Sequence, residues 1–167
     1  MEKINNNLQN IKSNSFKNNI KNNFKSLKDH TSTVRHLSTL NDGRLISCGC
    51  DCILNIYKIN SYELQLSIKE HSSRINSFTQ INDGRIITCS SDITMKVIKL
   101  IEENKYKVDQ ELKEHSDYDC KIIEIKENEL ISISKDKAMK IWKLNNENKF
   151  ELLVTITFQN LQSSLIF

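Results

Sequence analysis

Three sets of side chains in this sequence have the residue types of a hydrolytic triad. Each set contains a histidine, a hydroxyl residue 17 positions later and an aspartate 21 positions after the histidine. The sets are His30, Ser47 and Asp51; His71, Thr88 and Asp92; and His115, Ser132 and Asp136. A triad enzyme needs one accessible nucleophile beside its base, but here the set is repeated and falls on predicted strands and turns. We therefore expect structural roles for these residues, no catalytic residues and no enzyme activity.

Cysteines at alternate positions form a second group that could do chemistry, Cys48, Cys50 and Cys52. Structural zinc normally takes four ligands from two such clusters, and no histidine lies beside this run at zinc-finger spacing. We therefore predict no metal site and no cofactor. The five cysteines are an odd number without paired spacings, which favours a reducing compartment, the cytoplasm or the nucleus.

The elements that must position these side chains are also repeated. Residues 27–59, 68–100 and 112–144 align with one another, and their histidines lie 41 and 44 residues apart. A fixed period of this length indicates a repeat architecture. Within each period, short β-branched and apolar runs alternate with turn signals such as Asn41-Asp42-Gly43 and Asn82-Asp83-Gly84. Four antiparallel strands fit into each period.

These features resemble the WD-repeat family of β-propellers, whose repeat has a histidine before the first strand, a hydroxyl in the second, an aspartate in the next turn and a tryptophan in the third strand. The matching positions are His30, Ser47, Asp51 and Tyr57; His71, Thr88, Asp92 and Ile98; and His115, Ser132, Asp136 and Trp142. The resemblance covers about residues 27–153 and implies a structural network. A histidine ring can bond the aspartate and the hydroxyl at once, and an indole N–H adds a further donor. The pattern departs at Tyr57 and Ile98, and no repeat keeps the Trp-Asp dipeptide.

The resemblance implies an all-β fold, a partial propeller of about three four-stranded antiparallel blades in an open arc. We expect an Asn/Lys-rich low-complexity tail at 1–23, disordered or helical, and the propeller part at 24–167. Its repeats are predicted at about 27–67, 68–111 and 112–158, with the start of a further blade at 159–167. Propellers close with four to eight blades, so three leave two apolar faces bare. We expect self-association, completion by a partner, or a truncated part of a longer propeller.

The resemblance implies a non-enzymatic scaffold or adaptor that binds proteins on the rim around the channel. The candidate rim residues are Thr33, Arg35, Cys50, Arg74, Asn76, Ser91, Tyr118, Cys120 and Lys135. Arg35, Arg74 and Lys135 come from different repeats and should converge, which suits an acidic or phosphorylated segment of a protein partner.

Two other functions stay open. The chain has 24 Lys and Arg against 21 Asp and Glu, and residues 1–28 alone hold six lysines and one glutamate, so the tail is basic and the rest is slightly acidic, 18 against 20. A basic tail could neutralise nucleic-acid phosphates, although its lysines are dispersed and only Phe16 and Phe24 could stack on bases. The other alternative is a gene fragment with no autonomous function. No apolar run approaches the roughly 18 residues of a membrane span, so we expect no membrane association.

Overall fold

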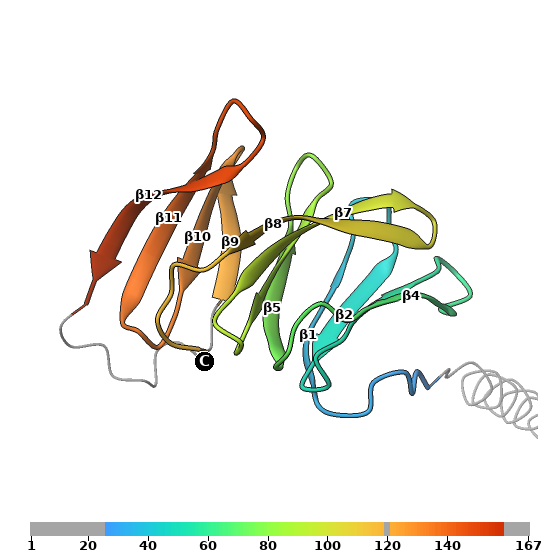
Figure 1. Ribbon diagram of the computed structural model, residues 1–167. Helices are drawn as coiled ribbons and strands as arrows, with labels where there is room; N and C mark the ends of the chain where they lie inside the picture. Colours follow the sequence, from blue (N-terminus) through green and yellow to red (C-terminus); the bar gives the residue numbers. More distant parts are fainter. Residues whose placement is uncertain (1–25, 119–120, 159–167) are drawn as a thin grey trace, which may run out of the picture.

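The computed structural model describes residues 26–118 and 121–158. These residues form three four-stranded antiparallel sheets that stand side by side (Figure 1). Blade 1 consists of β1 (Val34–Thr39), β2 (Leu45–Gly49), β3 (Leu54–Tyr57) and β4 (Leu64–Ile68). Blade 2 consists of β5 (Ile75–Gln80), β6 (Ile86–Ser90), β7 (Met95–Glu102) and β8 (Lys105–Leu112). Blade 3 consists of β9 (Lys121–Lys126), β10 (Glu129–Ile133), β11 (Ala138–Leu144) and β12 (Phe150–Thr157).

Tight turns join the first two strands of each blade. Gly43 and Gly84 have φ angles of 88° and 90°, in the region that a Cβ atom disfavours, and both end a predicted Asn-Asp-Gly turn. Asp42 and Asp83 each accept a hydrogen bond of 3.0 Å from the backbone N–H two residues later. Blade 3 lacks a glycine at this turn, and Asn128 takes the positive φ, 65°. Asparagine tolerates this conformation better than most residues, so the turn survives the substitution.

The hydrophobic core consists of two layers, which we call the first seam, between blades 1 and 2, and the second seam, between blades 2 and 3. The first seam contains Leu40, Ile46, Cys48, Leu54, Ile56, Ile68, Ile75, Phe78, Ile86 and Ile98. The second contains Ile81, Ile87, Cys89, Met95, Val97, Leu112, Ile122, Leu130, Trp142 and Phe150. Each blade thus excludes water from its apolar side chains by packing against the next blade.

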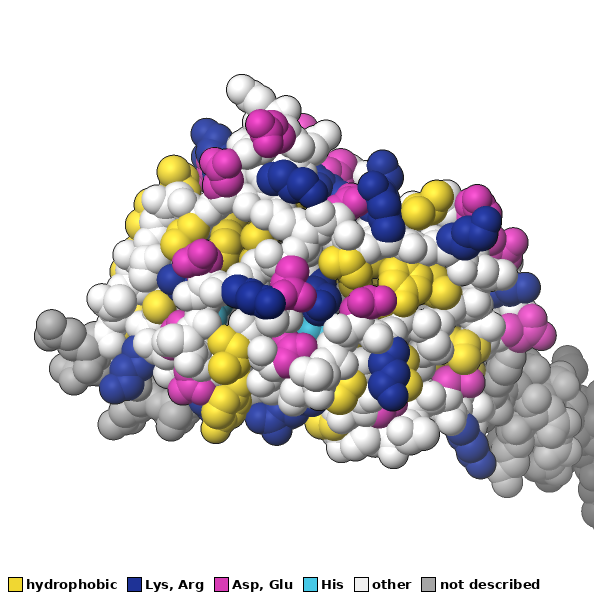
Figure 2. All heavy atoms as spheres, viewed as in Figure 1, with side chains coloured by type: hydrophobic (Ala, Val, Ile, Leu, Met, Phe, Trp, Pro, Cys, Tyr) yellow, Lys and Arg dark blue, Asp and Glu magenta, His cyan; other side chains and the backbone are white. Residues whose placement is uncertain are grey.

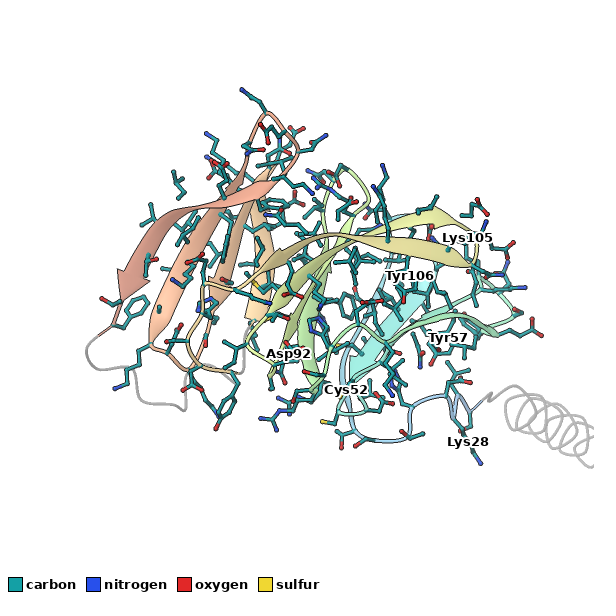
Figure 3. All side chains as sticks on the ribbon, in the orientation of Figure 1. Lys28, Cys52, Tyr57, Asp92, Lys105 and Tyr106 are labelled. Atoms are coloured by element: carbon teal, nitrogen blue, oxygen red, sulfur yellow. The ribbon has the colours of Figure 1, made fainter. Side chains whose placement is uncertain are left out.

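Polar contacts made by outer strands reinforce both seams. At the first, the Tyr106 hydroxyl on β8 donates at 2.9 Å to Oε1 of Glu70, which lies in the loop between β4 and β5; Tyr106 is labelled in Figure 3. Across the second, Gln110 Nε2 donates to the carbonyl of Phe150 at 2.7 Å, and the Phe150 N–H donates back to Gln110 Oε1 at 2.8 Å. These two reciprocal hydrogen bonds fix the position of blade 3 along the direction of its strands relative to blade 2.

The predicted fold class is confirmed, because the described residues are all-β and form three four-stranded blades in an arc. They include no helix long and apolar enough to cross a membrane. The predicted tail at 1–23 and the segment 159–167 lie outside the described residues, as do five of the six N-terminal lysines. The sixth, Lys28, is exposed (Figure 3).

Candidate functional site

The most complete polar network lies in blade 3. Trp142 Nε1–H donates to Ser132 Oγ at 2.8 Å, Ser132 Oγ lies 2.7 Å from His115 Nε2, and His115 Nδ1 lies 2.7 Å from Asp136 Oδ2. An indole N–H can only donate and an ionised carboxylate can only accept. The chain therefore runs in one direction: Ser132 accepts from Trp142 and donates to His115, and His115 donates to Asp136.

The same arrangement recurs in blades 1 and 2. His30 Nε2 lies 2.7 Å from Ser47 Oγ and its Nδ1 lies 2.9 Å from Asp51 Oδ2. His71 Nε2 lies 2.7 Å from the Thr88 hydroxyl and its Nδ1 lies 2.8 Å from Asp92, which Figure 3 labels near the turn after β6. The structure therefore brings all three predicted sets together with nearly equal distances.

Each aspartate also organises the backbone around it. Asp92 accepts from the N–H of Ser72, which follows the histidine, at 3.0 Å and from the N–H of Thr94 at 3.0 Å. Asp51 and Asp136 accept from the two equivalent amides, at 2.9 and 3.3 Å and at 3.1 and 2.9 Å. The aspartate thus links the loop that enters its blade to the turn between the second and third strands.

These networks are buried. Ser47, Thr88 and Ser132 are 3%, 0% and 0% exposed, so their hydroxyls are inaccessible to a substrate. Burial acts to raise the pKa of Asp92, but the hydrogen bonds from His71 and Thr94 outweigh it and hold that pKa well below its usual range. Burial lowers the pKa of His115, although Asp136 opposes the effect. At Asp136 burial also acts to raise the pKa, but the hydrogen bond from His115 and those from the backbone outweigh it and lower that pKa. A neutral His115 imidazole that donates to an ionised Asp136 carboxylate agrees with both of these shifts.

The predicted rim residues lie where the inner strands begin and just before the turn aspartates. One backbone hydrogen bond recurs in all three blades. The N–H of Cys50 donates to the carbonyl of Thr33 at 2.8 Å, that of Ser91 to the carbonyl of Arg74 at 3.0 Å, and that of Lys135 to the carbonyl of Tyr118 at 3.2 Å. Cys120 lies outside the described residues. The three blades therefore present their rim residues at equivalent places.

Two of the three predicted basic residues converge. Lys135 Nζ lies 4.5 Å from the centroid of the Tyr118 ring, and the guanidinium carbon of Arg74 lies 5.8 Å from it. Arg74 Nε also donates to Ser91 Oγ at 3.0 Å, and Asn76 Nδ2 donates to the same oxygen at 2.9 Å. The third basic residue, Arg35, is exposed at a bulge of β1 and is not among the cations on this ring. We call Arg74, Tyr118 and Lys135 the rim cluster.

A shallow depression of about 500 Å³ lies beside the rim cluster. Its lining residues are Cys50, Cys52, Ser72, Ser73, Arg74, Ser91 and Tyr118. Cys52 is labelled in Figure 3 near the turn after β2, at the same end of the sheets as Asp92. The depression is therefore lined from blades 1 and 2 and from the loop that enters blade 3.

The cysteines differ in their surroundings. Cys48, Cys50 and Cys52 are free, and burial raises the pKa of the Cys48 thiol to about 12. Within residues 26–118 and 121–158, no cluster of three metal-ligating side chains occurs. Cys89 on β6 is disulfide-bonded, unlike these three cysteines.

A comparison with known protein families agrees with this repeated blade geometry. Two segments, 21–58 and 62–99, match the family described as WD domain, G-beta repeat. This is a WD-repeat protein. No curated protein matches the chain. Repeat 62–99 begins in the β3–β4 connection of blade 1 and ends within β7 of blade 2. This repeat therefore contributes the outer strand of blade 1 and three strands of blade 2, which links the two blades covalently.

The tryptophan position of the WD repeat varies between the blades. Tyr57, Ile98 and Trp142 are 2%, 1% and 1% exposed, so all three fill the slot. Only Trp142 reaches the hydroxyl residue of its network, whereas Ile98 packs in the first seam. Among the described residues no hydrogen bond joins Tyr57 to Ser47, so blade 1 uses the aromatic ring without its donor.

Sequence reasoning missed several structural residues of the WD repeats. Ser90 and Ser134, two residues after the network hydroxyl, donate to the carbonyls of Ser73 and Asp117 at 3.1 and 2.7 Å. Blade 1 has Gly49 there, and a Cβ would lie 2.7 Å from the Thr33 carbonyl oxygen. The recurrence of small residues at this position was the available signal.

Proposed function

We propose that this WD-repeat protein is a non-enzymatic scaffold or adaptor, and that its rim cluster binds an acidic or phosphorylated segment of a protein partner. WD-repeat proteins are generally interaction modules, which supports the general class. The more specific proposal rests on one observation, the convergence of Arg74 and Lys135 on the exposed ring of Tyr118.

The chemistry of the rim cluster suits this ligand. A guanidinium presents a planar set of donors that matches carboxylate and phosphate oxygens. The Tyr118 ring lies beside both cations and adds a rigid aromatic surface, the type of residue that often dominates interface energetics. The adjacent depression of about 500 Å³ offers room for the neighbouring residues of such a segment.

The test is a binding titration with fluorescent peptides of three kinds: rich in aspartate and glutamate, carrying phosphoserine, and carrying the uncharged counterparts. We expect the charged peptides to bind and the uncharged ones to bind far more weakly. The double substitution Arg74→Ala, Lys135→Ala should weaken binding about tenfold or more, which corresponds to about 1.4 kcal/mol or more. Higher salt should weaken the wild-type complex as well.

The matched control is Lys58→Ala, Lys99→Ala, which removes two exposed cations outside the rim cluster. This variant should bind like the wild type. Equal binding of charged and uncharged peptides, or equal loss in the two double variants, would contradict the assignment of the rim cluster.

A further inference from the structure

The outward face of blade 3 repeats the residues that blades 1 and 2 bury in the seams. Five positions of each repeat form this face, which we call the trailing face. In blade 1 they are Leu40, Ile46, Cys48, Leu54 and Ile56, and in blade 2 they are Ile81, Ile87, Cys89, Met95 and Val97. All ten are 3% exposed or less. In blade 3 they are Ile125, Ile131, Ile133, Met139 and Ile141, and each is exposed or half-buried.

The strand register places these five side chains on one surface. Ile131 pairs with Ile123 on one side and with Ile141 on the other, and Ile141 pairs with Val154. Residues paired across strands point to the same face of a sheet. The surface therefore crosses all four strands of blade 3. Its most exposed members are Ile123 at 56%, Ile125 at 44% and Val154 at 40%. Figure 2 shows hydrophobic side chains reaching the edge of the molecule on the side of blade 3.

Blade 1 exposes the complementary surface at the other end of the arc. Blades 2 and 3 bury Phe78 and Ile122 in the seams, and the equivalent residue of blade 1, Leu37, is 57% exposed. Leu64, which pairs with Tyr57 on the same face, is 41% exposed. We call this surface the leading face. In each seam the trailing face of one blade packs on the leading face of the next, and within residues 26–118 and 121–158 apolar side chains of one copy of each face remain exposed.

We propose that two copies of this chain associate head to tail, with the leading face of each on the trailing face of the other. One contact of this type is heterologous, and two of them close a ring by two-fold symmetry. Two arcs of three blades give six blades, within the four to eight that propellers use. A second copy covers both faces with the type of contact that the two internal seams already make. This inference stands apart from the proposed function, because it uses the end faces and not the rim.

The test is sedimentation of the 167-residue chain over a wide concentration range. We expect a dimer, at twice the monomer mass of 19.5 kDa. Leu37→Lys on the leading face and Ile125→Glu on the trailing face should each weaken dimerisation at least tenfold. An equimolar mixture of these variants should dimerise again, because one of its two seams is fully wild type and the other pairs Lys with Glu. Ile101→Glu, on the β7–β8 hairpin, should dimerise normally.

Five outcomes would overturn the proposal, and the first four concern the oligomeric state and its response to the variants. They are a monomer at every concentration, a dimer insensitive to both face variants, open-ended oligomers, and a mixture that stays monomeric. A dimer lost only with the trailing-face variant would also overturn it, because like faces would then pair. Circular dichroism of each variant at low concentration separates loss of association from loss of folding.

Discussion

Replacing Asp136 with alanine should lower the free energy of unfolding by about 3–5 kcal/mol, because three hydrogen bonds to its carboxylate are lost. The carboxylate accepts hydrogen bonds from His115 Nδ1–H, from the N–H of Ser116 and from the N–H of Ala138. The side chains of Asp136 and His115 are only 6% and 5% exposed. The substitution therefore leaves a buried imidazole N–H and two loop amides without their acceptor, and the cost of such orphaned groups is large.

Asp42→Ala is the matched control for this prediction. Asp42 also accepts from the amide two residues later, at 3.0 Å, but its side chain is 52% exposed and its partner is Arg44. An exposed pair of this kind contributes little, so we expect a loss below about 1 kcal/mol. Urea denaturation measures both values. Similar losses in the two variants would show that the network of blade 3 is not what stabilises that blade.

Replacing Trp142 with phenylalanine should cost about 1–3 kcal/mol. The phenyl ring keeps most of the packing in the second seam, but it removes the N–H that donates to Ser132 Oγ at 2.8 Å. In this variant Ser132 still donates to His115, but it no longer accepts a hydrogen bond from the indole N–H, which sets the direction of the hydrogen-bond chain. Both residues are at most 1% exposed, so water cannot replace the lost donor.

A double-mutant cycle with Ser132→Ala isolates this bond. The two substitutions together should cost less than the sum of the separate losses, because each already removes the shared hydrogen bond. The same cycle between Ile98→Val and Thr88→Ala in blade 2 is the control. Ile98 has no donor to lose, so those losses should add. Additive losses in blade 3 would contradict the role of the indole.

Much of the fold was predictable because its sequence pattern occurs three times in the chain. The period of the histidines and the Asn-Asp-Gly turns indicated the blades, and the intervals of 17 and 21 residues marked residues that meet in space. The offset between the boundaries of the WD repeat and those of the four-stranded blade was less evident from the sequence. It depends on β4 pairing with β3 of its own blade, although β4 belongs to the repeat that builds the next blade.

The rim was harder to read from sequence. The alignment of the repeats placed the rim residues at equivalent backbone positions, but it did not predict the direction in which their long side chains point. Arg74 contacts the Tyr118 ring and donates to Ser91, whereas Arg35 lies at a bulge that interrupts the alternation of side chains along β1. The disulfide at Cys89 had no signal in the cysteine spacing. These features depend on local backbone conformation and on contacts between repeats.

The central claim is that each blade is held by a histidine ring that lies between a hydroxyl and an aspartate, with its Nδ1–H facing the aspartate. The protonation state of the four histidine rings at neutral pH, measured by nitrogen-15 NMR, tests it most directly. His30, His71 and His115 should carry their proton on Nδ1, facing aspartate, whereas the Nδ1 of His36 accepts the N–H of Phe78 and its proton should be on Nε2. On acidification His115 should titrate below the usual pKa of a histidine, 6.5, because burial lowers its pKa. Three slowly exchanging Nδ1–H signals and one Nε2–H tautomer are the predicted result; Nε2–H tautomers at His30, His71 and His115, or rings that average rapidly between the two forms, would contradict the account.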